Sequence, residues 1–327
     1  MDLKQELKKR VDFFNLQLDK FLKNGQPETL YDAARHLPLA GGKRLRPCIA
    51  MISCEAVKGD VTKIIPLTIS LELIHNFTLV HDDIMDKSKL RRNMQTVHKK
   101  YGEPTAIIAG DLLFTKAFEA YHKTQVEPQT FKNVEYGLID CVRLICEGQQ
   151  LDMEFEKRQT VTEDEYIDMI LKKTAVFFMY AAEAGSIIGG GKKEQSQLLS
   201  EYGKNLGLAF QIHDDYLDMS STKETLGKDI GNDIRNGKKT LIATHSMDNA
   251  SDDDKKLLEI IFGNKNATEQ QIKQVYNIFN KTGSIEYAKN TAIKYCEKAK
   301  KQLENIDESE SKQLLIKLAD YSIQREK

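Results

Sequence analysis

The sequence has little that would divide the chain or cross-link it. Its 327 residues include no tryptophan, six prolines and five cysteines. No Pro/Gly/Ser-rich linker separates two halves, so we expect one large domain over residues 1–327. The cysteines are odd in number and contain no CxxC pair. They therefore predict neither a disulfide framework nor a zinc site, and they indicate a reducing compartment.

The chain also lacks a charge bias and a clear membrane segment. Its formal net charge of −1 gives no general attraction to nucleic acid or to an anionic membrane. The first residues mix acids with bases, unlike a signal or transit peptide. No uncharged apolar run reaches the roughly 18–20 residues that span a bilayer, and the longest candidate, 176–191, is interrupted by Glu183. We predict a soluble cytoplasmic protein with no nucleic-acid partner and no integral membrane segment.

Helical periodicity is the dominant pattern. Over residues 3–24 the apolar positions recur every three or four residues, as in an amphipathic helix. Further helical patterns cover residues 28–37, 47–57, 110–123, 131–156 and 193–219. Thr162 and Glu165 form a capping box that begins another helix. No alternating strand of useful length is present, so we expect an all-α protein built as a single large helical bundle.

The most informative stretch, residues 73–98, is an apolar helix that ends in acidic residues. His75, Asp82 and Asp86 share one helix face, because they are spaced by seven and four residues. Carboxylates beside an apolar core are costly unless a cation meets them. Arg91 and Arg92 follow shortly afterwards. The pattern suggests a place where a divalent metal and a phosphate are brought together.

The acidic motif occurs twice, as HDDIMD at 81–86 and as HDDYLD at 213–218. Each copy follows a mainly apolar helix and precedes a basic loop. A single copy is more often a solvated helix face, but two copies in matching contexts favour a function. Carboxylate ligands without clustered His or Cys favour Mg²⁺, and neutralising a diphosphate makes it a leaving group. The sequence therefore predicts Mg²⁺ sites around one diphosphate.

Basic residues near glycine turns and the acidic motifs supply cations for phosphate. Arginine forms bidentate phosphate contacts and lysine supplies a mobile charge. These residues are Lys43, Arg44, Arg46, Arg91, Arg92, Lys172, Lys173, Lys228, Lys238 and Lys239. Each one alone is more often an ordinary surface residue, so their placement is the argument for a role.

Seven motifs in this order resemble those of the trans-polyprenyl diphosphate synthases, over about residues 38–242. They are GGKRLRP at 41–47, DDIMD at 82–86, RR at 91–92, GDLLF at 110–114, KTA at 173–175, FQIHDDYLD at 210–218 and GKDIGNDIRNGKKT at 227–240. The resemblance implies an isoprenoid-synthase bundle with a central apolar cavity, usually a homodimer. It implies a Mg²⁺-dependent prenyltransferase that condenses isopentenyl diphosphate with an allylic diphosphate. The family usually reads RRGxPTVH after the first acidic motif, whereas Asn93 and Gln95 replace the Gly and Pro here.

The resemblance also implies roles for individual residues. The Mg²⁺ ligands would be Asp82, Asp86 and Asp83 in support on one side, and Asp214, Asp215 and Asp218 on the other. The allylic diphosphate would be held by Arg91, Lys173, Thr174, Gln211, Lys228 and Lys238. Isopentenyl diphosphate would be held by Lys43, Arg46, His75 and Arg92. His81 and His213 lie one position off the acidic face, and their roles stay open.

Phe77 bears on the length of the product. It precedes Asp82 by five residues, about 7.5 Å along a helix; periodicity alone makes it an ordinary core residue. An aromatic there, with the small Thr78 beside it and no insertion in the motif, resembles archaeal-type geranylgeranyl diphosphate synthases, which make a twenty-carbon product. Farnesyl diphosphate is the alternative product. A terpene cyclase should instead have a second motif like NxxSxxxE, and a non-catalytic subunit should have lost one acidic motif.

Overall fold

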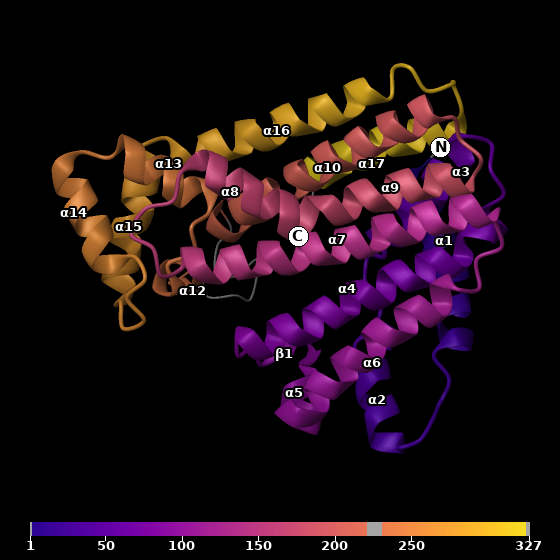
Figure 1. Ribbon diagram of the computed structural model, residues 1–327. Helices are drawn as coiled ribbons and strands as arrows, with labels where there is room; N and C mark the ends of the chain where they lie inside the picture. The colour runs from indigo at the N-terminus through magenta and orange to yellow at the C-terminus, as the bar shows by residue number, and fades with distance from the viewer. Residues whose placement is uncertain (1, 221–230, 325–327) are drawn as a thin grey trace. The chain divides into compact units, whose positions relative to one another are not determined.

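The computed structural model describes residues 2–220 and 231–324, and its regular structure there is helical apart from one short hairpin (Figure 1). The all-α fold expected from the sequence is confirmed. The chain forms two compact units. The first takes in the described residues of Met1–Leu138, Ala181–Gln197 and Asp307–Leu315; the second takes in those of Ile139–Tyr180, Leu198–Ile306 and Ile316–Lys327. The single domain expected over residues 1–327 stays a prediction.

The elements follow one another in chain order. The first ten are α1 (Leu3–Phe21), α2 (Glu28–His36), η1 (Pro38–Ala40), α3 (Leu45–Ala56), η2 (Val61–Ile64), α4 (Ile65–Met85), β1 (Leu90–Arg91), β2 (Met94–Gln95), α5 (Val97–Tyr101) and α6 (Glu103–Tyr121). They are followed by α7 (Pro128–Phe155), α8 (Glu163–Ile170), η3 (Leu171–Ala175), α9 (Val176–Ile188), α10 (Lys193–Ser220), α12 (Gly231–Asn236), α13 (Leu241–Asn249), α14 (Asp252–Ile261), α15 (Glu269–Lys281), α16 (Ser284–Gln302) and α17 (Glu310–Gln324).

Helix α4 is the core helix of the first unit, where it packs against α3 and α6. Pro66 lies in its first turn, where a missing N–H is tolerated. Gly110 lets α6 approach α4, because a Cβ there would lie 2.3 Å from His81 Nε2. The close approach fixes the end of α4 that carries the first acidic motif.

One helical segment of the described residues, Val61–Met85, is long and apolar enough to cross a membrane. This segment differs from 176–191, the longest candidate expected from the sequence. Of the most apolar window of Val61–Met85, 61% is buried inside the protein. Core helices of soluble proteins have the same composition and burial, so this is weak evidence for a membrane span.

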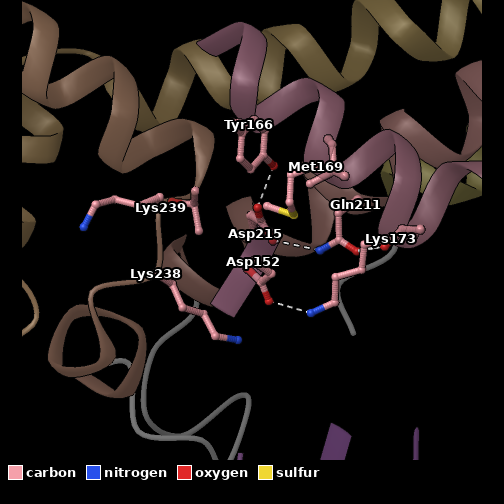
Figure 2. A pocket seen from close by; sticks show the side chains of 11 residues that line it. Asp152, Tyr166, Met169, Lys173, Gln211, Asp215, Lys238 and Lys239 are labelled. Carbon is pink, nitrogen blue, oxygen red and sulfur yellow. Dashed lines mark hydrogen bonds and ion pairs between the residues drawn. The ribbon is translucent and has the colours of Figure 1, made fainter. Parts of the chain in front are cut away.

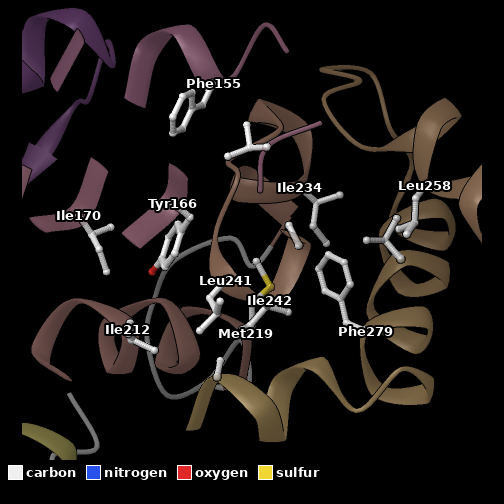
Figure 3. Close-up of a cluster of buried hydrophobic side chains, with 14 of the residues drawn as sticks. Phe155, Tyr166, Ile170, Ile212, Met219, Ile234, Leu241, Ile242, Leu258 and Phe279 are labelled. Carbon is white, nitrogen blue, oxygen red and sulfur yellow. The ribbon is translucent and has the colours of Figure 1, made fainter. Parts of the chain in front are cut away.

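The second unit has a hydrophobic core to which α7, α8, α10, α12, α13, α14, α15 and α16 contribute side chains (Figure 3). Its fully covered members include Ile212, Ile234 and Leu241. Burying each side chain of this size contributes about 1.5–3 kcal/mol. At its start, α8 has the predicted capping box: Thr162 Oγ1 accepts from Glu165 N–H, and the Glu165 carboxylate accepts from Thr162 N–H. Ile212 and Met219 of this core flank the second acidic motif, which lies within α10.

Candidate active site

The first acidic motif ends α4, and its three aspartates have different environments. Asp82 is half-buried and Asp86 is exposed at the helix C-cap. Asp83 is 1% exposed, and its Oδ1 accepts from Arg91 Nε at 2.8 Å. Burial raises the pKa of Asp83, while Arg91 acts to lower it. Asp83 therefore pairs with Arg91 from a covered position, and the metal role expected for it stays a prediction.

A short hairpin carries the two arginines that follow. Strands β1 and β2 pair antiparallel, with Arg91 opposite Met94. Arg92 and Asn93 form the turn and have φ of 52° and 60°. Asparagine tolerates this left-handed conformation better than most residues. Asn93 therefore replaces the family's usual glycine without losing the turn, and both arginines keep their places.

Arg92 is attached to the loop that carries Lys43. Its Nη1 donates to the carbonyl of Leu37 at 3.1 Å and to the carbonyl of Gly41. Gly42 has φ of 138°, and a Cβ there would lie 3.0 Å from Arg92 Cζ. A side chain at Gly42 would therefore crowd the guanidinium. The two segments predicted to hold isopentenyl diphosphate thus lie together in the first unit, with Lys43 exposed.

His75 and Arg46 also meet, with Arg46 Nη1 3.3 Å from His75 Nε2. Burial, followed by the charges of Arg46 and Arg92, holds the pKa of His75 well below its usual value. His75 is therefore neutral near pH 7, and its Nε2 accepts from Arg46. The structure brings Arg46, His75 and Arg92 into one cationic region.

Arg44 differs from its basic neighbours because it faces the core. It caps α3 with φ of 48° and is 4% exposed. Its Nη1 donates to Glu72, whose side chain is 2% exposed, and its Nε donates to Asn15 Oδ1 at 3.0 Å. A paired, covered arginine cannot reach a substrate. Arg44 therefore anchors the loop between Lys43 and Arg46.

A pocket in the second unit gathers residues that are far apart in the sequence (Figure 2). Eleven residues line it: Asp152, Tyr166, Met169, Ile170, Lys173, Thr174, Gln211, Asp215, Lys238, Lys239 and Thr240. Four of the six residues expected to bind an allylic diphosphate are among them. Of the other two, Arg91 belongs to the first unit, and Lys228 lies outside the described residues.

Lys173 and Thr174 reach the pocket from the π-helical turn η3, between α8 and α9. A π turn contains an extra residue, and such turns often occur at functional sites. Thr174 Oγ1 donates to Gln211 Oε1 at 2.9 Å. Lys173 Nζ donates to Asp152 Oδ2 at 2.6 Å. The lysine and the threonine are therefore each held by a neighbouring helix.

Asp215 in the second acidic motif is held by hydrogen bonds. Its Oδ2 accepts from Tyr166 OH at 2.7 Å, and its Oδ1 accepts from Gln211 Nε2 at 2.9 Å (Figure 2). Burial raises its pKa to about 7 despite both bonds. Asp215 thus resembles Asp83 in one respect: both are second in their motif and accept a hydrogen bond from a neighbouring side chain. Asp214, Asp215 and Asp218 of α10 are all half-buried, and the metal role expected for them stays a prediction.

Two lysines from the loop before α13 border the same pocket. Lys238 Nζ lies 3.9 Å from Asp233 Oδ1. Lys239 Nζ instead donates to the Gly237 carbonyl and lies 4.8 Å from the centre of the Phe262 ring. In Figure 2 the ammonium of Lys239 points away from the other labelled side chains. Lys238 is therefore the better placed of the two for an anion in the pocket.

Phe77 lies on the face of α4 turned to α6. Its ring centre is 4.9 Å from that of His81 and 5.3 Å from that of Phe114. Thr78 Oγ1 donates to the carbonyl of His75 at 2.8 Å. Phe77 is half-buried, unlike the fully covered Leu73. Neighbouring rings therefore pack against Phe77, and its role in product length stays a prediction.

Sequence reasoning missed two functional candidates in the pocket, Asp152 and Tyr166. Neither belongs to a motif that was singled out. Asp152 lies four residues after Gly148, and a helical glycine that precedes an acid by one turn was an available signal for close packing. Tyr166 gave no signal, because the partner of a buried tyrosine hydroxyl is not visible in a sequence.

Comparison with known proteins identifies the family of this chain. The Polyprenyl synthetase family model matches residues 27–279. A geranylgeranyl diphosphate synthase of Methanosarcina mazei is 42% identical over 327 residues, covering 100% of this chain and 99% of that protein. A geranylgeranyl pyrophosphate synthetase structure from Pyrococcus horikoshii Ot3 has a TM-score of 0.94 and 41% identity, covering 99% of this chain and 98% of that one. A polyprenyl synthase from Caulobacter crescentus CB15, solved with calcium and isoprenyl diphosphate, has a TM-score of 0.90 and 30% identity, covering 99% and 97%. The resemblance seen in the motifs is confirmed, and this chain belongs to the polyprenyl synthetase family.

Proposed function

We propose that this protein is a geranylgeranyl diphosphate synthase, which condenses isopentenyl diphosphate with dimethylallyl, geranyl or farnesyl diphosphate. The observation that carries the proposal is the pocket of the second unit. Lys173, Thr174, Gln211 and Lys238, which the family resemblance assigns to an allylic diphosphate, line that one pocket. The neighbours named geranylgeranyl synthases support the same activity.

We propose Mg²⁺ as the metal and Asp82, Asp86, Asp214 and Asp218 as its ligands. The family uses divalent metals. These four carboxylates offer hard oxygen donors, which suit Mg²⁺. Asp83 and Asp215 would instead orient Arg91 and Gln211, because their oxygens already accept from those side chains. Bound Mg²⁺ supplies charge neutralisation that makes the diphosphate a leaving group.

The protein's own groups bind and orient the two substrates. Lys173, Lys238 and Arg91 would stabilise charge on the departing allylic diphosphate as its C–O bond breaks. Lys43, Arg46, His75 and Arg92 would hold isopentenyl diphosphate. Its double bond attacks the allylic carbocation to form a C–C bond, and the released diphosphate accepts the proton lost from the adjacent carbon. No side-chain nucleophile is needed, so positioning and electrostatics supply the catalysis.

We propose that Phe77 sets the product length by blocking the growing chain. Its ring is held by Phe114 and His81, so it forms a stiff obstacle below Asp82. Thr78 stays small beside it. A product of fifteen carbons is the alternative. Both acidic motifs are complete, which argues against a non-catalytic subunit, and the second lacks the NxxSxxxE form of a terpene cyclase.

We further propose a homodimer in the cytoplasm. The family resemblance supports the homodimer. The five cysteines, which contain no CxxC pair, support the reducing compartment. Light scattering of the purified protein should give twice the 37.3 kDa chain mass. A mass equal to one chain at micromolar concentration would contradict the dimer.

The adjacent lysines of η3 allow a matched test of the activity. Lys173 lines the pocket, whereas Lys172 Nζ pairs with the exposed Asp168 at 2.8 Å. With Mg²⁺, isopentenyl diphosphate and farnesyl diphosphate, Lys173→Met should lower kcat/KM by about 10²–10³-fold, the usual loss of one charge-stabilising donor. Lys172→Met should stay within a factor of two or so. Equal losses in the two variants, or a wild-type protein that elongates no primer, would refute the proposed function.

A further inference from the structure

Asp152 lines the pocket without any role in the chemistry proposed above. It lies in the last turn of α7, and its side chain is 20% exposed. Its Oδ2 accepts from Lys173 Nζ at 2.6 Å, a short charge-assisted hydrogen bond. In Figure 2 the carboxylate lies between the ammonium groups of Lys173 and Lys238. A carboxylate beside lysines that are expected to bind a diphosphate would repel that anion, so its presence calls for an explanation.

Gly148 shows that α7 contacts Lys173 at a second point. Gly148 and Asp152 are four residues apart, so they share one face of α7. A Cβ on Gly148 would lie 2.2 Å from Lys173 N and 2.7 Å from Lys173 Cα. Only glycine permits this approach without displacing the backbone. Helix α7 therefore contacts the backbone of Lys173 through Gly148 and its ammonium through Asp152.

The other side of the turn η3 is packed just as closely. A Cβ on Gly207 of α10 would lie 2.5 Å from Ala175 Cα. The π turn is thus held between glycines of two helices. Its backbone is fixed, but the long side chain of Lys173 still needs a partner to stay ordered.

Lys172 provides the internal comparison. It has the same side chain and lies one position earlier, yet it pairs with Asp168, whose side chain is 50% exposed. Each lysine of the pair thus has its own aspartate, and only the Lys173 pair lines the pocket. The difference indicates that Asp152 directs its lysine towards a ligand.

We propose that Asp152, placed by the close contact at Gly148, is a positioning residue that holds the Lys173 ammonium ready for the allylic diphosphate. The proposal rests on the proposed function. Two effects of Asp152 oppose each other, because its charge repels a diphosphate while its hydrogen bond orders the lysine. Pairing with Lys173 compensates that charge, and an ammonium has three donors, so two remain for the ligand. We therefore expect the ordering to dominate.

The test compares Asp152→Asn with Asp168→Asn in the full chain. Asp152→Asn should raise the KM for farnesyl diphosphate about tenfold, the typical cost of ordering one long side chain on binding. The KM for isopentenyl diphosphate and the melting temperature should stay at wild-type values. Asp168→Asn should leave all three unchanged. In the Lys173→Met background, Asp152→Asn should add no further loss, because the lysine that it positions is gone.

Several outcomes would overturn the proposal. The first is an unchanged or lower KM for farnesyl diphosphate in Asp152→Asn. The second is an equal rise in the KM values for both substrates. The third is an effect of Asp152→Asn on the KM for farnesyl diphosphate that adds to the effect of Lys173→Met. Calorimetry with inorganic diphosphate and Mg²⁺ gives a readout that does not depend on turnover, and Asp152→Asn should weaken this binding about tenfold. An inactive wild-type protein that still shows this difference would count against the proposed function alone.

Discussion

The buried ion pair between Arg44 and Glu72 gives the sharpest prediction for stability. Both side chains are 2% exposed, and Glu72 Oε1 also accepts from Asn76 Nδ2 at 2.9 Å. Glu72→Gln keeps the shape and an acceptor oxygen but removes the charge that compensates the guanidinium. Breaking a buried pair from one side costs about 3–5 kcal/mol, because the remaining charge is left uncompensated.

That cost converts into a measurable shift. The unfolding entropy is about 2.1 cal/mol/K per residue, which gives about 0.7 kcal/mol/K for unfolding of the whole chain in one transition. Dividing the cost by this entropy predicts that the melting temperature falls by about 4–7 °C. Differential scanning calorimetry of the wild type and the variant measures the change. The KM for isopentenyl diphosphate should rise as well, because Arg44 anchors the loop between Lys43 and Arg46.

An exposed pair of the same residue types is the control. Arg143 and Glu147 pair across one helical turn, with side chains 53% and 43% exposed. Glu147→Gln should shift the melting temperature by only about 1 °C, since exposed pairs contribute about 0–1 kcal/mol. Equal shifts for the two variants would refute the reasoning. Arg44→Met/Glu72→Leu, which buries no uncompensated charge, should melt above Glu72→Gln.

Three further predictions follow from the same contacts. Asp83→Asn should release Arg91 and lower the free energy of unfolding by about 1–3 kcal/mol, measured by denaturant unfolding. The variant should also bind diphosphate more weakly, and an unchanged diphosphate affinity would contradict the role given to Asp83. Gly148→Ala should displace η3, lower kcat/KM, and reduce the free energy of unfolding by about 1–3 kcal/mol through overpacking. A variant with wild-type kcat/KM would contradict the close contact. Burial and the nearby arginines lower the folded pKa of His75, so stability should be greatest above the unfolded value of about 6.5 and should fall as the pH drops below it. His75→Asn should lose that pH dependence, and a profile identical to that of the wild type would contradict a neutral His75.

The sequence predicted most helices, because their signals are local. The helix expected at 28–37 is α2 (Glu28–His36), and the one at 193–219 is α10 (Lys193–Ser220). Apolar periodicity and stops such as Pro38 act within a few residues, so they are visible in a single chain. The hairpin of β1 and β2 was missed, because strands of two residues are too short to alternate.

Site residues could be predicted as a set, but not their individual environments. The spacing of a DDxxD motif does not show that Asp83 accepts from Arg91 or that Asp215 accepts from Tyr166. Their environments depend on Arg91 and Tyr166, which come from other segments. The π turn at Lys173 depends likewise on close packing by α7 and α10, which no local pattern encodes.

The central claim is that this chain adds isopentenyl units and stops at twenty carbons because of Phe77. The most direct measurement incubates the wild type and Phe77→Ala with Mg²⁺, isopentenyl diphosphate and farnesyl diphosphate, and resolves the dephosphorylated products by chain length. We expect a dominant twenty-carbon alcohol from the wild type and longer alcohols from Phe77→Ala. A wild-type product of any other length, or an unchanged product from the variant, would contradict the account.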